Sequence, residues 1–227
     1  MADHRLRVAA LRRERMRHRL LESALQLVAT VGPGELSIDA VIETARVSRG
    51  TFYKYFASPS ELVQTVAQEV TGELLRAIDQ IVIQRHDPAE RLAVGIRQVL
   101  RIAKRYPIVG GFFVRLGWPL GWHGSDTGQS FFELVPRDLE LGMAQGTFVP
   151  MHSSVPLNLI AGTVIGGIQS MLTETPPEDY GEQLVAAILR GLGVDKRKAL
   201  KLAYADLEDA TVASDSCLGR VLFVSRA

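Results

Sequence analysis

Hydrogen-bond donors gather in the segment Ser48–Phe56, which reads SRGTFYKYF. Their side chains end in guanidinium, ammonium and hydroxyl groups, which bind phosphate oxygens and the acceptor atoms on base edges. The donors belong to Arg49, Thr51, Tyr53, Lys54 and Tyr55. Phe52 and Phe56 are four residues apart, so one face of a helix can bury both rings and leave the donors on or beside the outer surface. The pattern predicts a short helix that touches a nucleic acid.

Ser48 and Gly50 fit such a helix in different ways. Ser48 is placed as the N-cap, because its side-chain oxygen can accept a hydrogen bond from one of the first backbone N–H groups. Gly50 costs a helix about 1 kcal/mol relative to alanine. A glycine at this position makes sense where the backbone must come close to another molecule.

A second helix must hold this segment in place, and the preceding residues supply it. Apolar side chains there recur with the spacing of a single buried helical face; they are Ile38, Val41, Ile42 and Ala45. Ser37 can cap this helix, and Asp39 suits the positive end of its dipole. With Arg46 and Val47 as the turn, residues 37–56 predict a helix-turn-helix. An ordinary helical hairpin with a solvated polar face has the same periodicity and is the alternative.

The same residues resemble a known signature. Ser48–Phe56, followed by Ser58 to Leu62, is similar to the N-terminal signature of the TetR (tetracycline-repressor) family, and the match covers about residues 17–65. The resemblance implies an all-α fold, in which an N-terminal three-helix bundle with a helix-turn-helix precedes a larger helical domain for ligand binding and dimerisation. It also implies that a small molecule releases the protein from DNA.

Two positions depart from the family pattern. The family usually has glycine in the turn where this chain has Arg46. The turn therefore either accepts a non-glycine residue in the left-handed conformation or is built differently. The family often has lysine at the start of the fourth helix, where this chain has Pro59 and Ser60. One expected phosphate contact therefore lacks its usual residue.

Positive charge is concentrated at the N-terminal end of the chain. The whole sequence has a net charge of +1, but residues 1–57 carry ten cations and six acidic side chains, a net charge of +4. The remaining residues carry 16 cations and 19 acidic side chains, a net charge of −3. A basic unit joined to a mildly acidic one is typical of DNA binding confined to one end of a molecule.

Composition points to a protein of the cytoplasm. The chain has 227 residues, of which 47% are hydrophobic, enough for one or two domains with a sizeable core. No apolar run is expected to reach the roughly 18 residues of a membrane-spanning helix, and the arginine-rich N-terminus lacks the apolar stretch of a secretory signal. Cys217 is the single cysteine, which fits a reducing compartment. A redox-sensing role for Cys217 is less favoured than that of a bystander thiol.

Segments without proline or glycine, and the capping residues at their ends, indicate the other helices. No proline or glycine interrupts residues 8–31, where the first helix is expected. The arginine-rich residues before it can serve as a flexible arm that reaches a minor groove or a phosphate, or stay disordered without DNA. Ser58–Glu61 combines a capping box with proline at the first helical position, so a long helix should follow as far as about His86. That helix connects the DNA-binding unit to the core, which places the domain boundary near residue 57.

The segment from Pro107 to Gly128 is expected to be irregular, with aromatic side chains among glycines and prolines. Such a segment suits a ligand pocket or its lid. Ordinary core packing is the alternative for each aromatic residue. The candidate ligand-binding residues are Phe112, Phe113, Trp118 and Trp122, together with Met143 and Gln169 from later helices. A mostly apolar, aromatic-bearing core suits a hydrophobic or aromatic effector.

Two later helices, expected at about residues 156–173 and 178–192, are candidates for a dimer interface. In the first, Gly162, Gly166 and Gly167 would let another helix come close. The resemblance implies that both helices pair with their copies in a homodimer, whose two-fold symmetry lets it read two half-sites. Packing within one chain is the alternative. Another short helix is expected at 196–210, and residues 214–227 have no assignable role.

Catalysis has little support in the sequence. There is no H-E-x-x-H, P-loop or G-x-S-x-G motif and no cysteine cluster, and the five histidines include no i, i+4 pair. No cofactor or metal is therefore expected. An enzyme with a cryptic site, or a helical binding or scaffolding module without specific DNA affinity, are the alternatives.

The sequence therefore predicts a dimeric DNA-binding regulator, most simply a repressor of an inverted-repeat operator, with activation as the alternative. Its domains are expected at residues 1–57 (DNA binding), 58–212 (ligand binding and dimerisation) and 213–227 (tail). The residues expected to contact base edges are Arg49, Thr51 and Tyr53. Those expected to position the phosphate backbone are Ser37, Ser48, Lys54 and Tyr55, with Gly50 permitting close approach.

Overall fold

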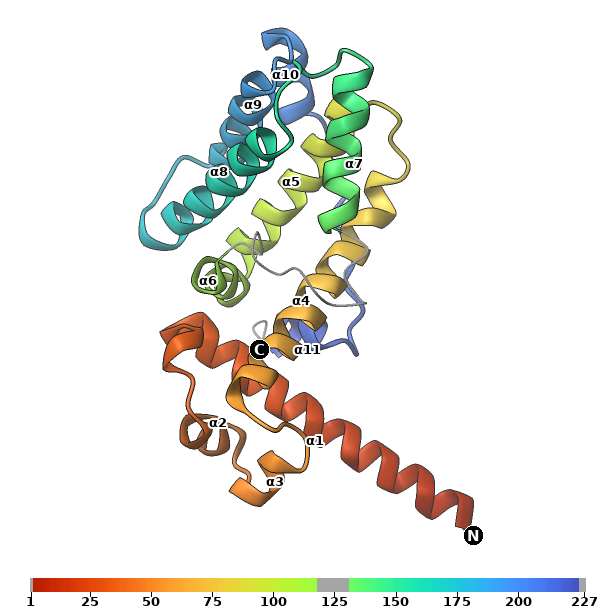
Figure 1. Ribbon diagram of the computed structural model, residues 1–227, viewed down its shortest axis with the longest axis vertical. Coiled ribbons are helices and arrows are strands. Elements are labelled where there is room, and N and C mark those ends of the chain that lie inside the picture. Colours follow the sequence, from red (N-terminus) through yellow and green to blue (C-terminus); the bar gives the residue numbers. More distant parts are fainter. Residues whose placement is uncertain (1, 118–130, 225–227) are drawn as a thin grey trace.

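The computed structural model describes residues 2–117 and 131–224, and every regular element in these ranges is helical (Figure 1). In chain order the elements are α1 (Ala2–Val31), the 3-10 turn η1 (Pro33–Glu35), α2 (Ile38–Ala45), α3 (Arg49–Tyr53), α4 (Pro59–Val82), α5 (Pro88–Arg105), α6 (Pro107–Leu116), α7 (Phe131–Ala144), α8 (Ser154–Thr173), α9 (Tyr180–Gly191), α10 (Lys196–Ala203) and α11 (Cys217–Val224). Helices α1, α2 and α3 form one end of an elongated molecule, and α4 leads from them into the larger helical body (Figure 1). The all-α fold predicted from the sequence is confirmed.

Helix α1 is longer than expected. It begins at Ala2, so the arginines before Val8 extend the helix where an arm was expected. Nothing in residues 2–31 breaks a helix, and alanine, leucine and arginine are among the best helix formers, which accounts for the extension. Its C-terminal half is packed through buried residues that include Leu20, Leu21, Ala24, Leu25 and Val28. Val31, the last residue of the helix, is 52% exposed.

The start of α4 at Ser58 was predicted correctly. Ser58 Oγ accepts a hydrogen bond from the Glu61 N–H at 3.1 Å, and the Glu61 carboxylate accepts one from the Ala57 N–H at 2.6 Å. The helix ends at Val82, a few residues short of the expected end. It buries apolar side chains along its whole length, starting at Leu62, so it connects the DNA-binding end to the body (Figure 1).

Helix α6 stands where the sequence analysis expected an irregular segment. It continues through Gly110 and Gly111, both of which lie close to neighbouring helices. A Cβ at Gly111 would lie 2.9 Å from the Ala29 carbonyl oxygen of α1, and one at Gly110 would lie 3.1 Å from Ile168 Cγ2 of α8. The glycines thus permit close helix packing, and the expectation of an irregular segment was wrong for residues 107–116.

Helices α8 and α9 lie within two residues of their expected ranges. The 20 residues of α8 carry no charged side chain, and the mean hydropathy of an 18-residue window reaches 1.4. By length and composition alone α8 could therefore span a membrane, which the sequence analysis did not expect. It packs against α6 and α9, and at Gly167 an added Cβ would lie only 2.3 Å from Leu184 Cδ1. Contacts inside the protein thus account for part of its apolar character.

The chain after α10 folds back along the molecule. Helix α10 ends earlier than expected, and residues 204–216 follow α5 instead. Gln98 Oε1 accepts a hydrogen bond from the Ala210 N–H at 3.1 Å, and Arg101 donates one to the Leu207 carbonyl at 2.9 Å. Backbone groups of Leu207, Glu208 and Ala210 therefore bond to α5 side chains, which explains why the predicted longer helix does not form.

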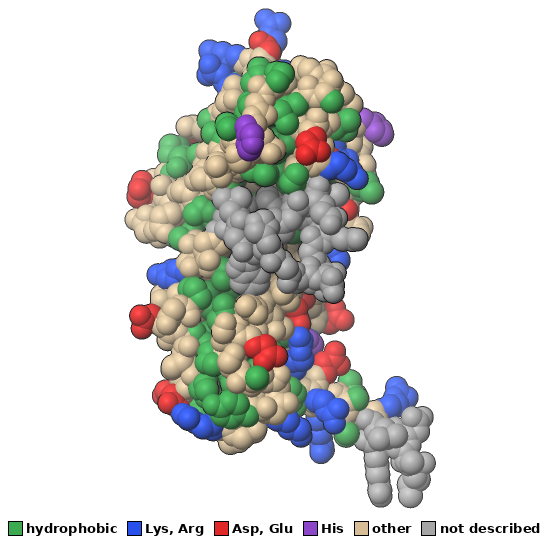
Figure 2. Space-filling model, viewed as in Figure 1, with side chains coloured by type: hydrophobic (Ala, Val, Ile, Leu, Met, Phe, Trp, Pro, Cys, Tyr) green, Lys and Arg blue, Asp and Glu red, His purple; other side chains and the backbone are tan. Residues whose placement is uncertain are grey.

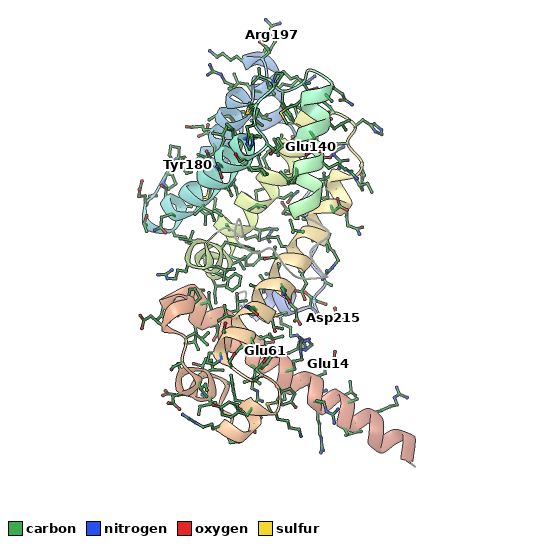
Figure 3. All side chains as sticks on the ribbon, viewed as in Figure 1. Glu14, Glu61, Glu140, Tyr180, Arg197 and Asp215 are labelled. Atoms are coloured by element: carbon green, nitrogen blue, oxygen red, sulfur yellow. The ribbon has the colours of Figure 1, made fainter. Side chains whose placement is uncertain are left out.

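Helix α11 gives the end of the chain a structural role that the sequence analysis did not assign. It docks against α4 and α1, and Figure 3 shows Asp215 in the turn just before it, beside α4. The Glu73 carboxylate of α4 accepts hydrogen bonds from the Cys217 N–H at 3.0 Å and the Leu218 N–H at 2.6 Å. A carboxylate at a helix N-terminus also suits the helix dipole. Helix α11 therefore joins the connecting helix to the DNA-binding end.

Candidate nucleic-acid interface and effector cavity

The turn between α2 and α3 contains a left-handed residue. Arg46 has φ 50° and ψ 53°, and its N–H bonds to the Glu43 carbonyl at 3.1 Å. The Val47 N–H then bonds to the Ile42 carbonyl at 2.9 Å. Glycine usually fills such a helix end. Of the two possibilities left open by the sequence, the structure therefore has the first, a non-glycine residue in the left-handed conformation.

Ser37 and Ser48 cap the two helices as predicted. Ser37 Oγ accepts a hydrogen bond from the Ala40 N–H at 3.2 Å. Ser48 Oγ accepts one from the Thr51 N–H at 3.1 Å and lies 2.9 Å from Thr51 Oγ1. The hydroxyls of Ser48 and Thr51 are therefore paired within the helix start, which fixes their positions at the exposed edge of α3.

Helix α3 ends at Tyr53, although the sequence analysis extended it to Phe56. The Lys54 N–H bonds to the Thr51 carbonyl at 3.2 Å, which tightens the last turn. Phe52 and Phe56 are nevertheless both buried, at 0% and 4% exposed, as the i, i+4 spacing predicted. Their rings anchor the turn and hold the short helix against the rest of the DNA-binding end.

Around these rings the donors form one exposed surface. Arg49, Tyr53 and Lys54 are exposed, with Tyr53 at 51%, while Tyr55 is half-buried and packs against the core. A Cβ at Gly50 would meet no atom closer than Ser48 Oγ at 3.9 Å. No neighbour among the described residues requires glycine there, so the space in front of Gly50 is open to another molecule.

Arg49 is held in place by Asp39 of α2. Arg49 Nη2 lies 2.5 Å from Asp39 Oδ1, and both side chains are largely exposed. The hydrogen bond to Asp39, followed by its charge, raises the pKa of Arg49 above its usual value. Because water surrounds this pair, the guanidinium can exchange the carboxylate for a phosphate or a base. Asp39 thus keeps Arg49 at the outer surface of the helix-turn-helix in the free protein.

A mostly apolar cavity of about 70 Å³ lies between α4, α5, α7 and α8. Its aliphatic walls include Leu75, Ile78, Val82, Ile96, Val99 and Val164. Three charged side chains, Asp79, Arg91 and Asp138, also line it. Typical ligand pockets measure roughly 300–1,000 Å³, and a cavity of about 150 Å³ can hold benzene, so this cavity must widen before it can hold even a single-ring molecule.

Arg91 and Asp138 form a buried ion pair in the cavity wall. Arg91 Nε donates to Asp138 Oδ2 at 2.7 Å, and the two side chains are 12% and 10% exposed. The other carboxylate oxygen, Asp138 Oδ1, is buried and has no hydrogen-bond partner among the described residues; Arg137 Nη2 lies 3.9 Å from it, beyond hydrogen-bond distance. A buried acceptor left unpaired costs about 1–3 kcal/mol. A hydrogen-bond donor on a bound molecule would remove that cost.

The expected ligand-binding residues that the structure describes do not line this cavity. Phe112 and Phe113 are buried in α6 with their ring centroids 5.7 Å apart, and neither lines the cavity. Met143 packs at the edge of the core, and Gln169 is exposed on α8. Core packing, the stated alternative for the aromatic pair, is what the structure has. The remaining candidates, Trp118 and Trp122, lie outside the described residues.

The sequence analysis missed Arg91 and Asp138, although one signal was available. Asp138 lies three residues after Val135 and directly before Leu139, so helical spacing places it beside these apolar residues on one face. A charged side chain on such a face must be paired to be buried. That position could have marked a polar group inside the core, but its partner on another helix could not be identified.

Cys217 does not have the surroundings of a reactive thiol. It is fully buried in α11, and burial, followed by the charge of Glu73, raises its pKa to about 12. Thiols react as thiolates, so this environment opposes a redox role. Within residues 2–117 and 131–224, no group of three or more His, Cys, Asp or Glu side chains is arranged to hold a metal ion.

Two family models match the chain. Residues 20–66 match the model described as bacterial regulatory proteins, tetR family, and residues 87–205 match a tetracyclin repressor-like, C-terminal domain. Among curated proteins, an uncharacterized HTH-type transcriptional regulator of Mycobacterium tuberculosis is 30% identical over 114 residues, which is 50% of this chain and 56% of that protein. The chain thus spans about half the length of the curated relatives it matches.

Solved structures extend the similarity to nearly the whole chain. A structure of RolR in complex with the ligand resorcinol is 30% identical, with a TM-score of 0.67, covering 89% of this chain and all (100%) of that one. A TetR family transcription regulator from Marinobacter aquaeolei is similar in fold, with a TM-score of 0.68 at 16% identity, covering 81% of this chain and 98% of that one.

Proposed function

Because the chain belongs to the TetR family and is a DNA-binding transcriptional regulator, we propose that it acts as a homodimeric repressor. It binds an inverted-repeat operator in double-stranded DNA and leaves it when a small molecule binds. We assign residues 1–57 to DNA binding, 58–212 to ligand binding and dimerisation, and 213–227 to a C-terminal tail. The protein works in the cytoplasm and needs neither a membrane nor a cofactor.

The exposed donors around α3 divide into two roles. Arg49 and Tyr53, with Thr51 at the helix start, contact base edges in the major groove. Lys54 and Tyr55 contact phosphates beside them. Ser37 and Ser48, whose hydroxyls cap the helices, place N–H groups at helix ends that face the DNA backbone, and Gly50 lets the backbone approach.

Dimerisation through α8 and α9 is supported by the surface of α8. Gly162 and Gly166 lie on an exposed face where an added Cβ would meet nothing within 4 Å, and Val155 nearby is 50% exposed. A helix of a second subunit can come close to such a face. Two subunits related by a two-fold axis then present two copies of α3 to two half-sites about 34 Å apart.

The effector is proposed to be a small ring compound that carries a hydroxyl group. The observation that carries this proposal is the buried Asp138 oxygen, which has no hydrogen-bond partner among the described residues, in the wall of a mostly aliphatic cavity. A hydroxyl can donate to that oxygen while the ring packs against the aliphatic walls. The similar protein RolR is solved with resorcinol, a ring with two hydroxyl groups, which supports the same chemical class here.

Release from DNA follows from the position of α4. This helix begins beside the DNA-binding end and contributes Leu75, Ile78 and Asp79 to the cavity wall. An occupant that fits one placement of α4 better than another shifts the spacing of the two α3 helices away from the half-site spacing. It can do so only by its difference in affinity for the two states.

The DNA part of the proposal is tested by selecting bound sequences from a random duplex pool, followed by a salt titration on the enriched ones. An enriched inverted repeat whose affinity falls with salt is the expected result. If the protein is a dimer in solution but enriches no sequence, it is a helical small-molecule-binding or scaffolding protein, or an enzyme with a cryptic site.

The effector part is tested with resorcinol, phenol and toluene as probes. Resorcinol and phenol should raise the midpoint of thermal unfolding and release the enriched duplex, whereas toluene should do so only at much higher concentration. In Asp138→Asn the preference for the hydroxylated rings should shrink. If toluene is as effective as phenol in the unaltered protein, Asp138 does not bind the effector.

A further inference from the structure

The N-terminal half of α1 projects away from the rest of the protein (Figure 1). Residues 9–15 are exposed, and Figure 3 shows Glu14 on the projecting part of the helix, clear of the other elements. This half also precedes residue 20, where the family match begins, so it is a feature of this chain rather than of the matched domain. Its first fixed point on the body is Arg17, which forms an ion pair with Glu69 of α4.

The projecting helix is strongly basic. Residues 2–19 contain seven arginines and two acidic residues, a net charge of +5. Among the side chains that the structure describes, Arg17 is the one arginine of this segment with an ion-pair partner; no such partner is found for Arg7, Arg12, Arg13, Arg15 and Arg19. Like charges three and four residues apart destabilise an isolated helix, so a partner of opposite charge would stabilise this one.

One face of the helix is free of acidic side chains. Arg12, Arg15 and Arg19 follow the i, i+3, i+7 spacing of a single face and are all exposed. The residues that bury α1 against the body, such as Leu21 and Leu25, lie on the other side of the helix. The three arginines therefore form a basic stripe (Arg12, Arg15 and Arg19) directed away from the body.

We propose that this stripe binds the phosphates of the duplex that flanks each half-site. The proposal rests on the proposed function, because α3 must first place the protein on its operator. The projecting helix extends toward the same end of the molecule as α3, and Lys and Arg side chains follow that edge in the space-filling view (Figures 1 and 2). Phosphates are the densest negative charge available at that end, with one per ~1.7 Å of duplex axis.

The reach of the helix defines the length of DNA involved. From Arg12 to Arg19 the stripe spans roughly 10 Å at ~1.5 Å per residue, which corresponds to about three base pairs at ~3.4 Å each. The contact is therefore expected outside the base pairs that α3 reads, and it carries no base preference. It adds affinity that depends on flanking length and on salt.

The test uses the full-length protein and the enriched inverted repeat in two duplexes, one trimmed to the repeat and one with about ten extra base pairs on each side. The unaltered protein should bind the longer duplex roughly tenfold or more tightly at low salt. Arg12→Gln/Arg15→Gln should lose that advantage and lower the salt slope by about two per subunit. Arg7→Gln/Arg13→Gln removes the same charge from other faces of the helix and is the matched control. This variant should keep most of the preference for the longer duplex and most of the salt slope.

Each alternative result has a definite meaning. Equal binding of the two duplexes by the unaltered protein would make the projecting half a solvated helix and overturn the proposal, with the proposed function intact. Equal losses in the two double variants would overturn the assignment to this stripe. Failure to enrich any sequence would overturn the proposed function and this proposal together.

Discussion

Arg91 of α5 and Asp138 of α7 lie 2.7 Å apart in the wall of an apolar cavity, and only one of the two carboxylate oxygens is satisfied by the guanidinium. The pair ties α7 to α5 where both helices border the space proposed for the effector. The second oxygen of Asp138 either remains unpaired or accepts a hydrogen bond from a molecule bound in the cavity. Stability and ligand preference are therefore linked at Asp138.

Asp138→Asn separates the contribution of Asp138 to stability from its contribution to ligand preference. The substitution keeps the size of the side chain but removes the charge that balances Arg91, so the free energy of unfolding should fall by about 1.5–3 kcal/mol, the size of a hydrogen bond to a charged group. Urea unfolding without ligand measures this loss. Arg137→Gln on the same helix is the control; its side chain is 66% exposed, so a change within about 0.5 kcal/mol is expected. Equal losses of unfolding free energy in both variants would show that the buried Arg91–Asp138 pair stabilises the protein no more than an exposed charge does.

Arg49→Ala and Lys54→Ala should affect DNA binding in different ways. Loss of a base contact at Arg49 should reduce discrimination between the operator and point variants of it by about 1–3 kcal/mol at the affected base pair. Loss of a phosphate contact at Lys54 should weaken binding to all duplexes and lower the salt slope by about one per subunit. Competition binding against operator variants at several salt concentrations distinguishes the two. Equal loss on every sequence for both variants would overturn this division of roles.

The helix-turn-helix could be predicted because its determinants are local. Ser37 and Ser48 cap helices whose first N–H groups are three residues away, and Phe52 and Phe56 share a face by their spacing alone. The exact end of α3 was missed because Phe56 is buried whether the helix continues to it or ends at Tyr53 in a tight turn.

The cavity could not be predicted, because its polar groups come from separate helices. Arg91 and Asp138 are 47 residues apart, and Glu73 reaches the α11 N–H groups across 144 and 145 residues. A stripe on one helix shows that a face is buried but not which helix covers it. Gly110 and Gly111 were misinterpreted for the same reason, since a glycine that breaks a helix and one that admits a neighbour look alike in sequence.

Gly111→Ala tests whether the contact between α1 and α6 requires glycine. The new Cβ would lie 2.9 Å from the Ala29 carbonyl oxygen, a backbone atom that cannot rotate away, so stability should fall by about 1–3 kcal/mol. Gly72→Ala in α4 is the control, because its nearest neighbour is the flexible end of Arg76 at 3.2 Å. That variant should be neutral or gain up to about 1 kcal/mol from helix propensity. A stabilised Gly111→Ala would show that α1 and α6 can separate at no cost.

Cys217 should report on the docking of α11 through its rate of alkylation. The thiol is buried and its pKa is raised to about 12, so iodoacetamide should react almost only with molecules in which α11 has opened. Glu73→Gln removes the charge and one acceptor at the start of α11. A loss of 1–2 kcal/mol in docking would then accelerate labelling by roughly 5–30-fold. Glu69→Gln on the same helix is the control, because the charge of Glu69 also raises the pKa of Cys217, whereas its carboxylate pairs with Arg17 of α1. Acceleration confined to Glu73→Gln would establish this carboxylate as the group that holds the end of the chain against α4, whereas equal acceleration in both variants would assign the effect to α4 itself.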